Sequence, residues 1–209
     1  MKNNEELVYK IITLGDSGVG KTSIIRRYVY NDFDMNTMST LGLNFAFKDV
    51  TLKNGVKIKI KLIDTAGQEK YKSLSKNYIK NAEGVIFVFS YNDEEEKINS
   101  FEHINQWVEL FNEYNDTDKI QKYLVGNKSE YKDQSQIKES NIKELSAKIG
   151  GKFISVSAKL DDNIKELFED LTEMMYKNIK KSNKQKTKKI GKYHKDKKSV
   201  CNLCNEHEN

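Results

Sequence analysis

The chain has 209 residues, 37% hydrophobic and 32% charged, which suits one globular domain with additional polar sequence attached. Its net charge of +5 is unevenly distributed: residues 179–209 hold ten lysines against three acidic residues, so residues 1–178 carry −2. This balance excludes nucleic-acid binding by a basic domain surface, and two cysteines in the tail, Cys201 and Cys204, exclude a disulfide scaffold.

Apolar runs alternate with segments of helical periodicity along the chain. The apolar runs predict strands at Leu7–Leu14, Asn44–Leu52, Val56–Ile63, Gly84–Tyr91, Ile120–Val125 and Lys152–Val156. The periodic segments predict helices at Gly20–Tyr30, Gln68–Asn81, Lys97–Tyr114, Lys138–Ile149 and Asn163–Lys180. Asn54-Gly55 is typical of a hairpin, which makes one strand pair antiparallel. We therefore expect an α/β fold: a mostly parallel six-stranded sheet with one antiparallel edge strand, flanked by about five helices.

A glycine-rich motif lies between the first predicted strand and the first predicted helix. It reads Gly-Asp-Ser-Gly-Val-Gly-Lys-Thr over residues 15–22 and fits the phosphate-loop pattern G-x-x-x-x-G-K-[ST]. Glycines let the backbone approach a phosphate closely, and the loop N–H groups and the helix N-terminus point at the anion. We expect Lys21 to reach the β- and γ-phosphates and the Thr22 hydroxyl to ligate Mg²⁺. The predicted nucleoside-phosphate site consists of Gly15, Asp16, Ser17, Gly18, Val19, Gly20, Lys21, Thr22 and Ser23.

A second motif, Asp64-Thr65-Ala66-Gly67-Gln68-Glu69, follows the third predicted strand. An aspartate at a strand end beside a phosphate loop can hold Mg²⁺, usually through water. The Gly67 N–H would face the γ-phosphate, and Gln68 would orient an attacking water. The alternative is a turn that only caps the next helix. The phosphate loop upstream favours the catalytic interpretation.

Three further segments complete a recognisable set: Ser39–Phe45, Gly126-Asn127-Lys128 and Ser157-Ala158-Lys159. Together with the two motifs above, they resemble the small GTPases of the Ras superfamily, and most of all the Rab family. The resemblance covers residues 7–178 and implies a G domain there. After Ile179 the apolar periodicity ends and Lys, Asn, Ser and Gln take over, which predicts a flexible lysine-rich tail over residues 179–209. It implies a switch in vesicle trafficking that binds GTP or GDP with Mg²⁺ and hydrolyses GTP slowly unaided.

The resemblance also implies roles for single residues. Lys21 and Gln68 would be catalytic, and Thr40 would join Thr22 and Asp64 in holding Mg²⁺. Phe33 would pack against the guanine. The base would be bound by Asn127, Lys128, Glu130, Ser157, Ala158 and Lys159, with Ala158 offering its backbone N–H.

Two segments, Asp34–Phe45 and Ala66–Tyr78, correspond to the switch segments of the family. Contacts with the γ-phosphate would order both, and hydrolysis would release them. The resemblance implies that an exchange factor, a GTPase-activating protein and effectors bind there. Ile63 stands where Rab proteins place a tryptophan, which indicates a divergent set of effectors.

The base-binding motif departs from the family pattern N-K-x-D, because residues 127–130 read Asn-Lys-Ser-Glu. The extra methylene of Glu130 moves the carboxylate by about 1.5 Å. Losing part of a paired contact costs on the order of 1–3 kcal/mol, which predicts weakened guanine recognition. The alternative is that Glu130 lies in an ordinary loop with a shifted register. Glu130 and Ile63 also leave open a second function, a nucleotide-dependent binding scaffold that hydrolyses GTP poorly.

The tail allows three interpretations. Cys201 and Cys204 could carry prenyl groups in an irregular arrangement, they could lie in an unmodified end, or they could bind zinc with His194 and His207. The lysines of residues 180–198 are either a solvated charge run or an attraction to an anionic membrane surface. We expect a cytoplasmic protein bound peripherally to the cytosolic face of an internal membrane, with no nucleic-acid partner.

Overall fold

The computed structural model describes residues 7–34, 43–65, 79–92, 99–116 and 119–180. The chain divides into two compact units, Met1–Met175 and Tyr176–Asn209. The sheet and the labelled helices all belong to the first unit. In the second unit, residues 176–180 are helical.

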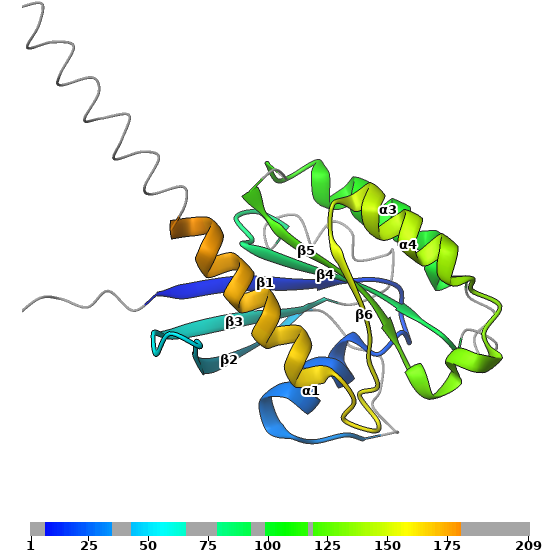
Figure 1. The fold of residues 1–209 in the computed structure, drawn as a ribbon, viewed down its shortest axis with the longest axis horizontal. Coiled ribbons are helices and arrows are strands. Elements are labelled where there is room, and N and C mark those ends of the chain that lie inside the picture. Colours follow the sequence, from blue (N-terminus) through cyan, green and yellow to red (C-terminus); the bar gives the residue numbers. More distant parts are fainter. Residues whose placement is uncertain (1–6, 35–42, 66–78, 93–98, 117–118, 181–209) are drawn as a thin grey trace, which may run out of the picture. The chain divides into compact units, whose positions relative to one another are not determined.

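The first unit is built on a six-stranded sheet with the order β2-β3-β1-β4-β5-β6 (Figure 1). Neighbouring strands run parallel except β2 and β3, which are antiparallel, so the edge strand β2 is the reversed one. This confirms the predicted fold class. The strands are β1 (Val8–Leu14), β2 (Leu43–Thr51), β3 (Lys57–Thr65), β4 (Gly84–Ser90), β5 (Gln121–Asn127) and β6 (Lys152–Ser155).

The turn between β2 and β3 forms the predicted hairpin. Gly55 has φ +80°, the left-handed region that favours glycine. The Asn54 side-chain oxygen accepts from the Val56 N–H at 3.1 Å, and the Leu52 N–H donates to the Val56 carbonyl at 2.9 Å. The Asn-Gly pair therefore fixes the register of the only antiparallel pair in the described sheet.

Two strands are longer than the apolar pattern predicted, and both extensions lie at the functional end. β3 continues through Asp64 and Thr65, which pair with Asn44 and Leu43 of β2. β5 continues through Gly126 and Asn127, which pair with Phe89 and Ser90 of β4. Polar residues and a glycine interrupted the apolar runs, so the pattern ended before the backbone pairing did.

The longer helices among the described residues of the first unit are α1 (Lys21–Tyr30), α3 (Ser100–Asn112), α4 (Glu139–Ile149) and residues 164–175, with a 3-10 helix, η3 (Ser129–Gln134). α3 begins later than predicted because the Asn99 side chain caps it, accepting from the Glu102 N–H at 3.4 Å. α3 and α4 lie side by side, joined by Lys148 and Asn105 (Figure 1). The helix predicted at Gln68–Asn81 lies outside the described residues apart from its last three.

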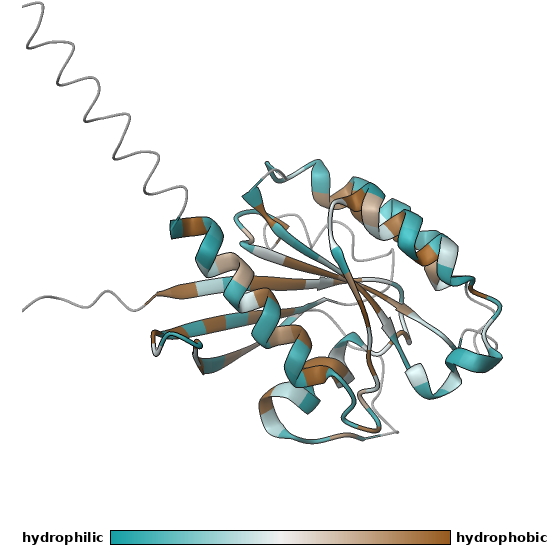
Figure 2. Cartoon of the chain, in the orientation of Figure 1, coloured by the Kyte–Doolittle hydropathy of each residue, from teal (hydrophilic) through white to brown (hydrophobic). Residues whose placement is uncertain are grey.

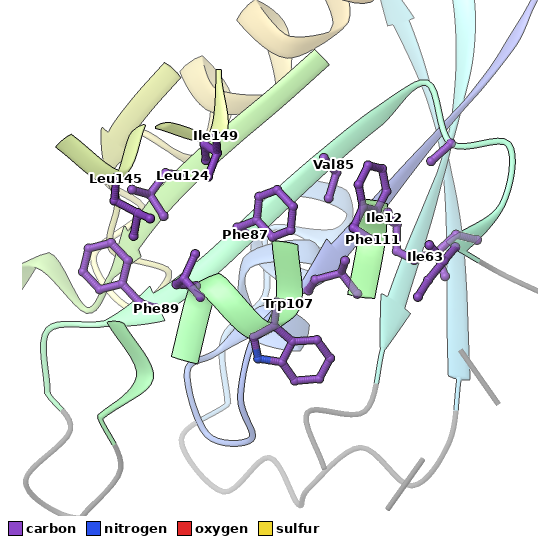
Figure 3. Close-up of a cluster of buried hydrophobic side chains, with 14 of the residues drawn as sticks. Ile12, Ile63, Val85, Phe87, Phe89, Trp107, Phe111, Leu124, Leu145 and Ile149 are labelled. Atoms are coloured by element: carbon purple, nitrogen blue, oxygen red, sulfur yellow. The ribbon is translucent and has the colours of Figure 1, made fainter. Parts of the chain in front are cut away.

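A hydrophobic cluster fills the space between the sheet and α3 and α4 (Figure 3). β4 lies at its centre, with all seven residues buried. Phe87 and Phe111 meet edge to face with ring centroids 5.9 Å apart. Figure 2 shows the resulting pattern, apolar along the central strands and mixed on the helices. In the described part of the chain, no helix is both long and apolar enough to cross a bilayer.

Candidate functional site

The glycine-rich loop connects β1 to α1 at the carboxyl end of the parallel strands. Gly20 caps α1 with φ +90°, and a Cβ there would lie 2.2 Å from the Asn127 amide nitrogen. A Cβ on Gly15 would lie 2.2 Å from the Val88 carbonyl oxygen. Glycine is required at both positions because the loop lies directly against β4 and the end of β5.

Lys21, the first residue of α1, lies beneath this loop with 5% of its surface exposed. Its Nζ donates to the carbonyl oxygens of Gly15 at 2.9 Å and Asp16 at 2.6 Å. Burial lowers the pKa of Lys21 to about 8, although the negative charges of Asp64 and Asp16 act in the opposite direction. The ammonium group is thus fixed at the phosphate loop.

Thr22 and Asp64 come together beside Lys21. The Thr22 hydroxyl donates to Asp64 Oδ2 at 2.6 Å. Asp64 is 3% exposed, and its other oxygen, Oδ1, has no hydrogen-bond partner among the described residues. Burial raises the pKa of Asp64, while the Thr22 hydroxyl and Lys21 lower it. A buried, unpartnered carboxylate oxygen next to a hydroxyl is a set of hard oxygen donors that fits Mg²⁺.

Two buried threonines explain how Asp64 reaches the loop. The Thr13 hydroxyl donates to the Ile63 carbonyl at 3.1 Å, and the Thr65 hydroxyl donates to the Thr13 carbonyl at 2.7 Å. These bonds join the ends of β1 and β3 beyond their ladder, which ends at Ile12 and Ile63. They hold the end of β3 beside the start of the loop.

Asn127, at the end of β5, joins the loop to the segment after β6. Its buried amide nitrogen donates to the Val19 carbonyl at 2.8 Å, and its amide oxygen accepts from the Ala158 N–H at 3.2 Å. Ser157 is fixed in turn, because its hydroxyl accepts from the Leu160 N–H at 3.0 Å. The phosphate loop and both predicted base-binding segments therefore meet at one side chain.

Replacing Asn127 with alanine is expected to destabilise the nucleotide-free protein by about 2–4 kcal/mol, because the Val19 carbonyl and the Ala158 N–H lose their buried partner. Urea unfolding of the two proteins measures this difference. Asn115→Ala is the control, since its amide makes one hydrogen bond, to the Phe111 carbonyl. Equal losses from the two variants would contradict the joining role of Asn127.

Glu130 is the second residue of η3, which follows Lys128 in the left-handed conformation, with φ 59°. One of its carboxylate oxygens, Oε2, is buried and has no hydrogen-bond partner within the described part of the chain. The preceding Ser129 N–H donates to the Val156 carbonyl at 3.0 Å, which ties η3 to the segment after β6. Glu130 thus presents an unused acceptor next to Asn127 and Lys128.

Arg27 contributes to the base-binding part of the site, although it belongs to none of the sequence motifs. Its Nε donates to the Ala158 carbonyl at 2.9 Å, and its Nη2 donates to the Lys159 carbonyl at 3.3 Å. Its guanidinium also lies 5.8 Å from the centroid of the Phe33 ring. One arginine of α1 therefore connects the predicted guanine-packing aromatic to the predicted base-binding segment.

Asp16 makes a second contact that the sequence did not reveal. His103 Nδ1 lies 2.6 Å from Asp16 Oδ2, and the Trp107 indole N–H donates to Asp16 Oδ1 at 2.8 Å. Both partners come from α3, and neither belongs to one of the sequence motifs. A buried indole N–H needs an acceptor, but no pattern identifies which one.

Several predicted residues lie outside the described part of the chain: Thr40, Gly67 and Gln68, most of Asp34–Phe45, all of Ala66–Tyr78, and Cys201 and Cys204. Phe45, at the end of one such segment, is described and is 60% exposed on β2. It pairs in register with the buried Ile63 of β3.

The fold and this site define a class: an α/β domain with a phosphate loop after its first strand. Residues 10–177 match the Ras family. Ras-related protein Rab-15 of Homo sapiens is 34% identical over 84% of this chain and 80% of its own. Ras-related protein RabC of Dictyostelium discoideum is 37% identical over 85% and 89%, and Ras-related protein SEC4 of Saccharomyces cerevisiae is 37% identical over 82% and 77%. The chain therefore belongs to the Ras family, as a Rab-like small GTPase.

Proposed function

We propose that this chain is a GTP/GDP switch that hydrolyses GTP and acts in vesicle trafficking, with residues 7–178 as its G domain. The observation that carries the proposal is the arrangement of Lys21, Thr22 and Asp64. The Lys21 ammonium is buried under the loop. The buried Asp64 carboxylate accepts from the Thr22 hydroxyl at Oδ2, 2.6 Å away, and its Oδ1 has no partner among the described residues. This provides one cation for phosphate oxygens and two oxygen donors for a metal.

In this proposal Lys21 stabilises negative charge on the β- and γ-phosphates. Thr22 and Asp64, with Thr40, hold Mg²⁺, which would neutralise charge on the phosphate oxygens when bound. Gln68 orients the attacking water. Asn127, Lys128, Glu130 and Ala158 bind the base, with Phe33 packed against it.

Unaided hydrolysis should be slow, because both arginines of the chain have other partners. Arg26 pairs with Asp32, and Arg27 is bonded to the Ala158 and Lys159 carbonyls. An arginine at the transferring phosphate supplies a large part of the catalysis in proteins of this kind. A GTPase-activating partner would have to supply it here, through Asp34–Phe45 and Ala66–Tyr78.

Gln68→Leu is expected to slow single-turnover GTP hydrolysis at least about tenfold, because the attacking water loses its orienting group. Phosphate release from the protein loaded with GTP measures the rate. Gln106→Leu, the same change on the exposed surface of α3, is the control. A rate unaffected by Gln68→Leu would remove this residue from the proposed chemistry.

Chromatography of the nucleotide that co-purifies with the Mg²⁺-bound protein tests the proposal as a whole. Bound GDP supports a guanine-selective protein that hydrolyses GTP. Bound GTP favours the second function, a nucleotide-dependent scaffold, for which the motivating observation is Glu130 Oε2, unpartnered among the described residues. An adenine nucleotide or none would contradict both.

We further propose that residues 179–209 attach the protein to the cytosolic face of an internal membrane. The ten lysines of this segment would be attracted to anionic lipids, by about 1 kcal/mol per lysine near the surface. Prenyl groups on Cys201 and Cys204 would add the second signal that stable anchoring needs. Sedimentation with anionic vesicles, before and after removal of this segment, tests the attachment.

A further inference from the structure

The carboxylate of Asp16 is bound by two side chains from a different layer of the fold. His103 and Trp107 lie four residues apart on α3, so both face the same side of that helix. They contact the two different oxygens of Asp16, at 2.6 and 2.8 Å. The carboxylate is thus held at both oxygens by α3.

Asp16 is also a structural part of the phosphate loop. Its backbone carbonyl accepts from Lys21 Nζ at 2.6 Å, so the same residue contacts the buried ammonium on its main chain and α3 on its side chain. Any shift of α3 that moves His103 or Trp107 therefore acts on the residue that helps to position Lys21. A single residue, Asp16, thus connects α3 to Lys21.

Core packing alone does not account for this arrangement. Trp107 is 6% exposed and belongs to the hydrophobic cluster drawn in Figure 3, so its ring would be buried in any case. The His103 side chain, by contrast, is 44% exposed and contributes little to that cluster. The His103 ring therefore contacts Asp16 through a polar interaction and not through core packing. Its exposed part is accessible to a molecule that binds α3.

We propose that His103 and Trp107 are positioning residues for nucleotide binding, which fix the phosphate loop through Asp16 and so couple α3 to the nucleotide. This inference rests on the proposed function, because it concerns the affinity of the same site. It adds an element, α3, that contains none of the predicted site residues.

The measurement is the dissociation rate of a fluorescent GDP analogue from the full chain with Mg²⁺. His103→Ala and Trp107→Phe should each accelerate dissociation about 2- to 12-fold, the range for loss of one hydrogen bond. His103→Gln, which keeps an N–H donor, should recover most of the wild-type rate. Asn105→Ala is the matched control, since it removes a hydrogen bond between α3 and Lys148 of α4 and should leave the rate unchanged.

A double-mutant cycle separates positioning from general destabilisation. In an Asp16→Ala background, His103→Ala and Trp107→Phe should cause no further acceleration, because the bond they remove is already absent. Trp107 is the only tryptophan of the chain, so its emission should change on nucleotide release in the wild type and lose that change in Asp16→Ala. Melting temperatures confirm that each variant is folded.

The outcomes distinguish the two proposals. A wild-type protein that binds no guanine nucleotide overturns the proposed function and this inference with it. If the wild type binds guanine nucleotide, two results would overturn the inference and leave the proposed function standing. One is that His103→Ala and Trp107→Phe dissociate GDP at the same rate as Asn105→Ala. The other is that both accelerate dissociation by as much in the Asp16→Ala background as in the wild type.

Discussion

Lys21→Met is expected to weaken nucleotide binding about 30-fold or more, because truncating one partner of a buried charged contact costs about 2–5 kcal/mol. The same change should stabilise the nucleotide-free protein, in which burial disfavours the Lys21 ammonium. Titration with GDP measures the first effect and urea unfolding the second. Lys143→Met, on the exposed face of α4, is the control for both.

The stabilisation depends on pH in a defined way. The pKa of Lys21 is about 8 in the folded protein and 10.5 in the unfolded chain, so the unfolded chain binds more protons between these values. Stability of the nucleotide-free wild type should therefore rise by about 3 kcal/mol from pH 8 to 10.5 through this group. The full penalty applies below pH 8. Lys21→Met should remove this rise, and an unchanged slope would contradict the burial of the charge.

Glu130→Asp is expected to strengthen GDP binding by roughly 5- to 150-fold, because it restores the shorter side chain of the N-K-x-D pattern. The buried Oε2 of Glu130 has no partner in the described part of the chain, so the present carboxylate has an acceptor that those residues do not satisfy. Affinities for GDP and ADP, measured in competition, should show that the gain is specific to guanine.

The control for this change lies in the same 3-10 helix. Asp133→Glu alters an exposed carboxylate of η3 by one methylene and should leave both affinities unchanged. If Glu130→Asp has no effect either, the base is not read by residue 130, and the interpretation of an ordinary loop with a shifted register is supported.

The sequence predicted the strands well because their apolar runs are strong, as in β4, where every residue is buried. Its errors were at ends, where side chains outside the apolar pattern decide the boundary. Asn99 starts α3 by capping it, and Asp64 and Thr65 extend β3 although they are polar. Capping and backbone pairing at such positions depend on a partner in space, which periodicity does not encode.

In the candidate site, too, some residues are predictable from the sequence and others are not. The phosphate loop is contiguous in sequence, so the residue types alone predict its chemistry. Asp64 was found because its motif has a known relation to that loop, and Thr22 does bond to it. The bonds of Arg27 to the Ala158 and Lys159 carbonyls and the contacts of Asp16 with α3 belong to no motif, since these partners are 87 to 132 residues away. Only the folded backbone brings these groups together.

The reversed direction of β2 has a consequence for any partner that binds both predicted switch segments. Leu43, where the chain enters β2, is the register partner of Thr65, where it leaves β3. These two described residues, each next to one of the predicted switch segments in the chain, thus lie about 5 Å apart, one strand spacing. A partner that captures one segment holds the other at high effective concentration, so the second contact is formed as an intramolecular step. Two weak attachments can then give an avid complex.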